Sequence, residues 1–120
     1  MNLLTFSREL RLLTPADFKH VFNQSIRVSS PYITFVAREN SLTHCRIGFA
    51  IAKKQIKHAH DRNRLKRVIR EQFRLAQCEL PAIDVIVMAR SAASELDNSA
   101  LRAVVDKLWQ RLILMQKNQH

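Results

Sequence analysis

The feature that most constrains the fold is a change of hydrophobic period along residues 46–89. Residues 46–52 have the composition of a strand, whereas from about residue 58 to residue 78 the apolar side chains recur at the three- and four-residue spacing of an amphipathic helix. Pro81 ends this helix, and residues 82–89 are a nearly continuous apolar run, which is typical of a strand buried on both faces. The order strand, helix, strand predicts that these two strands pair in parallel.

The segment before this unit predicts a helix and one more strand. Thr14 can cap a helix, Pro15 fits its first position, and the helix continues to about residue 23. Residues 32–38 are rich in β-branched and aromatic side chains and predict a strand. The polar residues 39–44 then predict a hairpin loop that places the strand at residues 46–52 beside the strand at residues 32–38.

The C-terminal segment predicts a last helix. Ser94 or Asn98 can cap it, and apolar residues spaced by three and four continue to about Lys117. The predicted fold is therefore a single domain, residues 1–120, of the α/β class: an α+β sandwich with the order α-β-β-α-β-α and a mixed sheet.

Positive charge is concentrated on the central helix and the residues before it. The chain carries 20 Lys and Arg against 10 Asp and Glu, a net charge of +10, and residues 53–74 hold nine of these cations against two acidic residues, a net +7. Opposite the apolar stripe, a helical wheel places Asn63, Lys66, Arg67, Arg70 and Arg74, with Arg62 and Arg64 beside them. Like charges at this spacing repel one another unless an anion neutralises them. The pattern predicts a polyanion-binding face; the alternative is a solvated helix with an unusual charge excess.

Nucleic acid is the polyanion that fits these residues. Each Lys or Arg that neutralises a phosphate releases counterions, and the planar guanidinium of arginine also stacks on bases. Phe18, Phe22 and Tyr32 are candidate faces for unpaired bases, which favours RNA. For Phe18 and Phe22 the alternative is a role in the core.

The residues that a protein nuclease needs are not evident. Acidic residues are scattered without a DxD pair, and His58 and His60 are predicted to point in different directions unless their segment is extended. Gly48 is the only glycine, which excludes the glycine-rich loops that bind nucleotide phosphates. We expect no catalytic residue and no metal site in this chain.

The cysteines and the N-terminus favour a cytoplasmic protein. Cys45 and Cys78 lie in no CxxC pair and are interpreted as reduced thiols. A charge within the first eight residues interrupts the apolar stretch that a signal peptide or spanning helix requires. A basic amphipathic helix at a membrane surface is the alternative.

One motif carries a resemblance to a known family. Lys53 and Lys54 are followed by Arg-Asn-Arg-Leu-Lys-Arg at residues 62–67 and by Arg-Glu at residues 70–71, and Asp-Phe-x-x-Val-Phe stands at residues 17–22. In order, spacing and length these motifs resemble the protein subunit of bacterial ribonuclease P, over about residues 6–112.

The resemblance implies a set of functional residues. The basic helix of the family contacts the catalytic RNA, and a cleft between the first helix and the sheet holds the 5′ leader of precursor tRNA. Arg62, Asn63, Arg64, Lys66, Arg67 and Arg70 match the RNA-contact motif, to which the charge pattern adds Lys53, Lys54 and Arg74. Phe18 and Phe22 match the leader cleft, and Tyr32 is added to it from the alternation of its strand.

The resemblance also implies how the protein works. RNA with bound Mg²⁺ carries out the cleavage, and the protein assists as a monomer in a 1:1 ribonucleoprotein that removes the leader to give mature tRNA 5′ ends. It further implies a left-handed crossover between the strands at residues 46–52 and 82–89, where the general preference is right-handed. A general RNA-binding or ribosome-binding protein is the alternative function, and a protein-only metal nuclease is a third with little support in the sequence.

Overall fold

The computed structural model describes residues 15–22, 25–40, 44–76 and 82–118, without the side chains of residues 15, 17, 18, 20 and 116–118. In chain order the elements are α1 (Pro15–Phe22), β1 (Ile26–Ser29), β2 (Ile33–Glu39), β3 (Arg46–Phe49), α2 (Ala59–Ala76), β4 (Ile83–Ala89), the 3₁₀ helix η2 (Ser91–Glu95) and α3 (Asn98–Asn118). None of the helices described is long and apolar enough to cross a membrane.

The strands form one mixed sheet in the order β1-β2-β4-β3. β3 and β4 pair in parallel, as their order around α2 predicted, and the other two pairs are antiparallel. The predicted hairpin of residues 32–38 with residues 46–52 is wrong, because β4 lies between β2 and β3. β4 pairs with β2 along seven residues and is apolar along most of its length, so the centre of the sheet buries it best, whereas the four-residue β3 takes the edge.

β1 was not predicted from the sequence. Its four residues alternate between buried and exposed, with Ile26 and Val28 inside and Arg27 and Ser29 outside. Such a short alternation is too brief to recognise by period, and the pairing with β2 is what makes it a strand.

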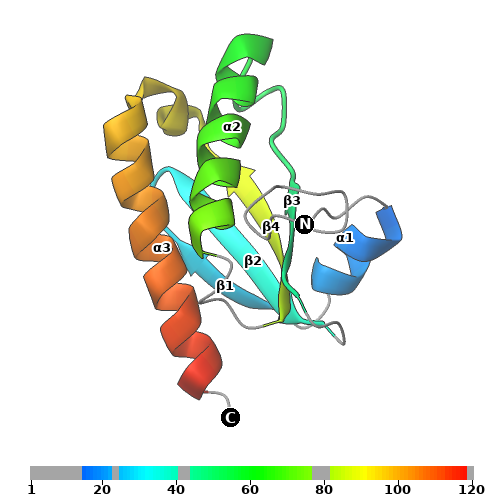
Figure 1. The fold of residues 1–120 in the computed structure, drawn as a ribbon. Helices are drawn as coiled ribbons and strands as arrows, with labels where there is room; N and C mark the ends of the chain where they lie inside the picture. The colour runs from blue at the N-terminus through cyan, green and yellow to red at the C-terminus, as the bar shows by residue number, and fades with distance from the viewer. Residues whose placement is uncertain (1–14, 23–24, 41–43, 77–81, 119–120) are drawn as a thin grey trace, which may run out of the picture.

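α2 and α3 lie side by side over one face of the sheet (Figure 1). The main core lies between them and the sheet, and it includes Phe35 of β2, Phe73 of α2 and Trp109 of α3. The ring of Phe35 lies 4.2 Å and that of Phe73 lies 6.0 Å from the Trp109 ring, measured between centroids.

The connection from β3 through α2 to β4 is a left-handed crossover. In Figure 1 both strands run upward, β4 lies to the left of β3, and α2 descends in front of the sheet. The family resemblance implied this hand, against the general preference.

α1 packs on the opposite face of the sheet. Its Val21 forms a second, smaller cluster with Val36 of β2 and Ile86 of β4. Strand residues alternate between faces, so Asp84 also belongs to this side. Asp84 is only 2% exposed, and Arg46 binds both of its carboxylate oxygens, through Nε at 2.9 Å and Nη2 at 2.7 Å.

Two details of the sequence analysis change with the structure. The cap of α3 is neither Ser94 nor Asn98 but Asp97, whose Oδ1 accepts a hydrogen bond from the Ala100 amide at 2.7 Å. Cys45 is buried and is not in a disulfide, whereas Cys78 and Thr14 lie outside the described residues.

Candidate nucleic-acid interface

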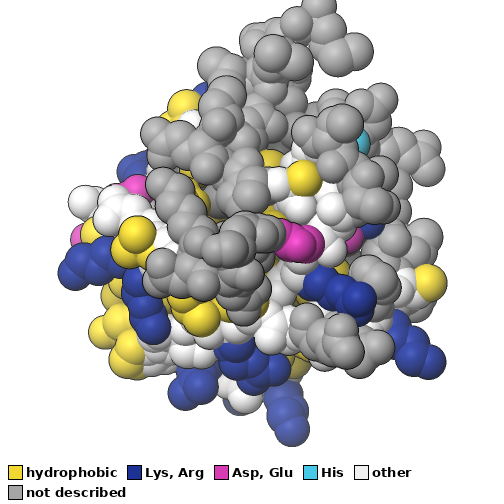
Figure 2. All heavy atoms as spheres, turned by 90° about the horizontal axis from the view of Figure 1, so that it is seen from below, with side chains coloured by type: hydrophobic (Ala, Val, Ile, Leu, Met, Phe, Trp, Pro, Cys, Tyr) yellow, Lys and Arg dark blue, Asp and Glu magenta, His cyan; other side chains and the backbone are white. Residues whose placement is uncertain are grey.

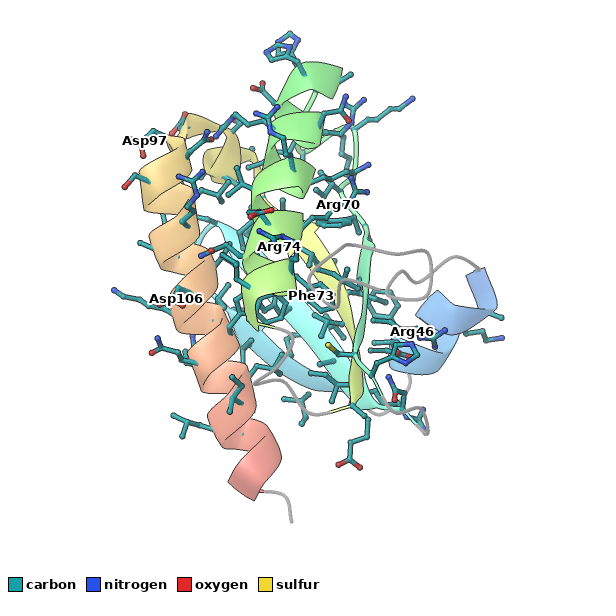
Figure 3. All side chains as sticks on the ribbon, in the orientation of Figure 1. Arg46, Arg70, Phe73, Arg74, Asp97 and Asp106 are labelled. Carbon is teal, nitrogen blue, oxygen red and sulfur yellow. The ribbon has the colours of Figure 1, made fainter. Side chains whose placement is uncertain are left out.

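The burial of α2 determines where its charges lie. Leu65, Val68, Ile69 and Phe73 are buried against the core, so the basic side chains of the helix are directed outward or to its flanks (Figure 3). The apolar stripe predicted from helical spacing is confirmed by these four buried residues. Gln72 lies at its edge and donates through Nε2 to the Arg102 carbonyl across the α2–α3 contact.

Five of the predicted RNA-contact residues have no hydrogen bond or ion pair with the described part of the chain. They are Lys53, Lys54, Asn63, Lys66 and Arg67, of which only Lys66 is half-buried. The four cations among them, Lys53 and Lys54 before α2 and Lys66 and Arg67 on it, are free to neutralise phosphates. This set is called the open basic surface below.

Arg62 and Arg64 are held by oxygen atoms that carry no formal charge. Arg62 Nη1 donates to the carbonyls of Ile56 and Lys57, at 2.8 and 2.9 Å, and so ties the β3–α2 connection to the first turn of α2. Arg64 is bound to α3 and η2 instead: its Nη1 lies 2.9 Å from Asn98 Oδ1, and its Nη2 lies 3.2 Å from the Ser94 carbonyl oxygen. Both guanidinium groups keep their full charge, because neither is paired with an acid by these bonds.

Arg70 and Arg74, near the C-terminal end of α2, are engaged differently (Figure 3). The guanidinium of Arg70 lies over the Phe49 ring, 5.1 Å from its centroid, in a cation–π contact with β3. Arg74 forms an ion pair with Glu71. The hydrogen bond from Arg74 lowers the pKa of Glu71, and the same bond raises the pKa of Arg74. The free positive charge of α2 is therefore concentrated in its first half.

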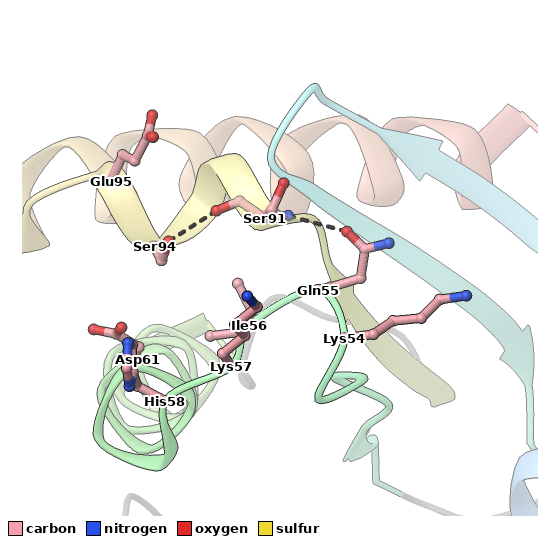
Figure 4. A pocket seen from close by; sticks show the side chains of 9 residues that line it. All are labelled: Lys54, Gln55, Ile56, Lys57, His58, Asp61, Ser91, Ser94 and Glu95. Carbon is pink, nitrogen blue, oxygen red and sulfur yellow. Dashed lines mark hydrogen bonds between the residues drawn. The ribbon is translucent and has the colours of Figure 1, made fainter.

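A pocket of about 320 Å³ opens beside the N-terminal end of α2, between residues 54–58 and η2 (Figure 4). The Ser91 amide donates to Gln55 Oε1 at 3.2 Å and joins its two walls. His58 lines it, and the His58 and His60 rings stack at 5.4 Å and 25°. The expectation that these rings point in different directions is wrong: His58 is the residue before α2, where its carbonyl accepts from the Asp61 and Arg62 amides, and its ring stacks on that of His60.

Of the three candidate aromatic residues, Phe22 and Tyr32 are not brought together. Phe22 is 43% exposed at the end of α1, and the Phe18 side chain lies outside the described part of the structure. Tyr32 is half-buried and packs against the main core, on the side of α2 and α3. On the α1 side, β2 instead presents Thr34, whose hydroxyl lies 3.2 Å from that of Ser29.

Positive charge also occurs away from α2. Seen from below, Lys and Arg side chains lie in several separate groups around the rim of the molecule, and acidic side chains are few (Figure 2). Among the residues that the structure describes, no group of three His, Cys, Asp or Glu side chains is placed to hold a metal ion.

A family model described as Ribonuclease P matches residues 6–113 of the sequence. The chain belongs to the ribonuclease P protein family. It is 55% identical over 119 residues to the ribonuclease P protein component of Haemophilus influenzae (strain PittGG), an alignment that covers 98% of this chain and all of the relative. It is 56% identical over 112 residues to that of Photobacterium profundum, which covers 93% of this chain and 95% of the relative.

Solved structures of ribonuclease P proteins have the same fold. A mutant of the Staphylococcus aureus RNase P protein superposes with a TM-score of 0.83 at 26% identity, covering 88% of this chain and 89% of that one. The RNase P protein from Thermotoga maritima gives 0.75 at 29% identity, covering 84% and 96%. The chain is thus a protein component of ribonuclease P, a ribonucleoprotein endoribonuclease, and ribonuclease P RNA is its partner.

Proposed function

We propose that the open basic surface and the two held arginines bind ribonuclease P RNA, while the RNA performs the cleavage with bound Mg²⁺. The observation that carries this proposal is the set of cations in the first half of α2 and the segment before it that have no partner among the described residues. Neutralising phosphates there lowers the repulsion between two RNA molecules that must approach each other.

The magnesium ions are proposed to bind the RNA rather than this chain. Mg²⁺ is bound through one or two carboxylates together with phosphate oxygens and waters. Asp84 is buried and bound by Arg46 and Asn40, so it is not available as such a ligand. The protein is proposed to act indirectly, because its cations stabilise the assembled RNA in which the ions bind.

The 5′ leader of precursor tRNA is proposed to lie on the α1 side of the sheet. Phe22 offers an exposed ring for base stacking there, and Phe18 belongs to the same helix. Arg27, which lies opposite Val36 on the same face, and Ser29 add exposed polar groups along β1, whereas Thr34 of β2 is only 7% exposed and its hydroxyl lies beside that of Ser29. Tyr32 is left out of this set because it packs with the main core.

We further infer that one protein joins one RNA and acts in the cytoplasm. Cys45 is buried and is not in a disulfide, which is compatible with a reducing compartment.

The test of the main proposal is reconstitution. Precursor tRNA is incubated at low millimolar Mg²⁺ with the protein, with ribonuclease P RNA, and with both, and leader release is followed on a gel. Strong cleavage in the mixture, little with RNA alone and none with protein alone is the expected result. Cleavage by the protein alone overturns the proposal. If the protein does not increase cleavage by ribonuclease P RNA and binds unrelated RNA with the same affinity, it is a general RNA-binding protein instead.

The placement of the interface is tested by salt dependence. Arg67→Ala removes an unpaired cation and is expected to reduce the slope of log K against log salt for RNA binding by about one unit. Arg74→Ala, on the same helix, is the matched variant, and its slope should change less because Glu71 already neutralises that arginine. Equal changes in both slopes would contradict the assignment of the RNA interface to the first half of α2.

A further inference from the structure

Arg64 is an RNA-contact candidate whose side chain is directed by another helix. Its Nη1 donates to Asn98 Oδ1 on α3 at 2.9 Å, and its Nη2 donates to the carbonyl of Ser94 in η2 at 3.2 Å. Bonds of this length from two different nitrogens fix both the position and the plane of the guanidinium. Arginine has five N–H donors, so three are left for a ligand.

The side chain of Asn98 is free for this task because its neighbour caps the helix. Asp97 Oδ1 accepts from the Ala100 amide, and the Asp97 carbonyl accepts from the Leu101 amide at 2.9 Å. Asn98 is the first residue of α3, where its amide group is not needed by the backbone. The one side-chain bond that Asn98 makes in the described structure is therefore the bond to Arg64.

The chemistry of the acceptor distinguishes Arg64 from Arg74. The partner of Arg74 is the carboxylate of Glu71, which cancels its charge, whereas an amide oxygen and a carbonyl hold Arg64 and leave its charge uncompensated. A phosphate that binds Arg64 finds a side chain that is already ordered, so less rotamer entropy is lost on binding.

We propose that Asn98 is a positioning residue for RNA binding: it does not contact the RNA but orients the Arg64 guanidinium from the start of α3. This inference rests on the proposed function, namely that the first half of α2 binds ribonuclease P RNA. It extends the functional unit to a residue 34 positions away in the sequence.

The test is a double-mutant cycle on the affinity for ribonuclease P RNA. Asn98→Ala is expected to weaken binding about 2- to 10-fold, the cost of ordering one long side chain, with no change in the salt slope. Arg64→Ala should weaken binding and lower the slope by about one unit. In the Arg64→Ala background, Asn98→Ala should have no further effect, because there is no guanidinium left to orient.

Two controls separate positioning from loss of structure. Ser99→Ala changes the next, exposed residue of α3 and should leave affinity unchanged, and thermal unfolding by circular dichroism should give similar Tm values for all variants. The inference is overturned if Asn98→Ala has no effect, or if it weakens binding by the same factor with and without Arg64. If Arg67→Ala and Arg64→Ala also leave affinity and slope unchanged, the proposed RNA interface itself has failed.

Discussion

The two faces of the sheet differ in how much apolar surface they bury. On the side of α2 and α3, apolar side chains from all four strands meet two long helices, and the aromatic rings of Phe35, Phe73 and Trp109 lie close together. On the side of α1, the buried cluster is centred on Val21, Val36 and Ile86 and covered by an eight-residue helix. The first face supplies most of the hydrophobic stabilisation, because that stabilisation scales with apolar area buried.

The α1 face combines its small core with polar and aromatic groups. The Arg46–Asp84 pair, the Ser29–Thr34 hydroxyl pair and the exposed Phe22 ring all belong to it. On this face Phe22, Arg27 and Ser29 remain exposed and leave surface for the proposed ligand, whereas the opposite face is closed by packing. The comparison predicts that stability and the proposed leader binding can be changed separately, and four substitutions test this.

The largest effect is expected at the main core. Phe35→Ala removes a fully buried ring and should lower the free energy of unfolding by about 3–5 kcal/mol. Val36 is the next residue in β2 and faces the α1 side. Val36→Ala should lower the free energy of unfolding by about 1–2 kcal/mol, because it removes only two methyl groups from a small cluster. Urea unfolding followed by circular dichroism measures both; similar losses would remove the distinction between the faces.

A smaller loss is expected from the polar network of the α1 face. Asp84→Ala leaves Arg46 without its carboxylate and should cost about 2–3 kcal/mol, less than for a fully buried pair because the Arg46 side chain is 22% exposed. The same substitution also removes an acceptor of the Asn40 amide. If the variant's unfolding free energy stays within about 0.5 kcal/mol of that of the unsubstituted protein, the range of an ordinary surface substitution, the pair adds nothing to stability.

The smallest effect on stability is expected at the exposed aromatic residue. Phe22→Ala should lower the unfolding free energy by only about 1 kcal/mol, because 43% of the residue is already exposed and less apolar area is lost from burial than at a core position. Affinity of the assembled ribonucleoprotein for precursor tRNA should nevertheless fall, while affinity for mature tRNA, which lacks the leader, stays the same. Equal losses for the two tRNAs would place Phe22 outside the leader site.

Local pattern was enough to predict the helices, three of the four strands and the fold class. The stripe of Leu65, Val68, Ile69 and Phe73 follows from helical period alone, and so does the outward direction of Asn63 and Arg67. The continuous apolar run at residues 83–89 also indicated a strand buried on both faces. The hand of the crossover came from the family resemblance, since the general rule predicts the opposite one.

Strand neighbours could not be predicted in the same way. The polar segment after β2 resembles a hairpin loop, but the order of strands depends on which pairing buries the most apolar surface. In the structure β4 pairs with both β2 and β3. The four-residue β1 is recognisable only through its pairing with β2. Both are consequences of contacts between distant parts of the chain.

The sequence by itself determined that this chain is a basic α+β protein whose positive charge is concentrated on one helix and the segment before it, because charge and period are properties of neighbouring residues. Only the tertiary structure decided which of those charges are available. Arg64 is held by Asn98, Arg70 lies on Phe49 and Tyr32 packs with the main core, and each of these contacts joins different elements of the fold. No local pattern encodes such partners, since they depend on how the helices and the sheet pack in three dimensions.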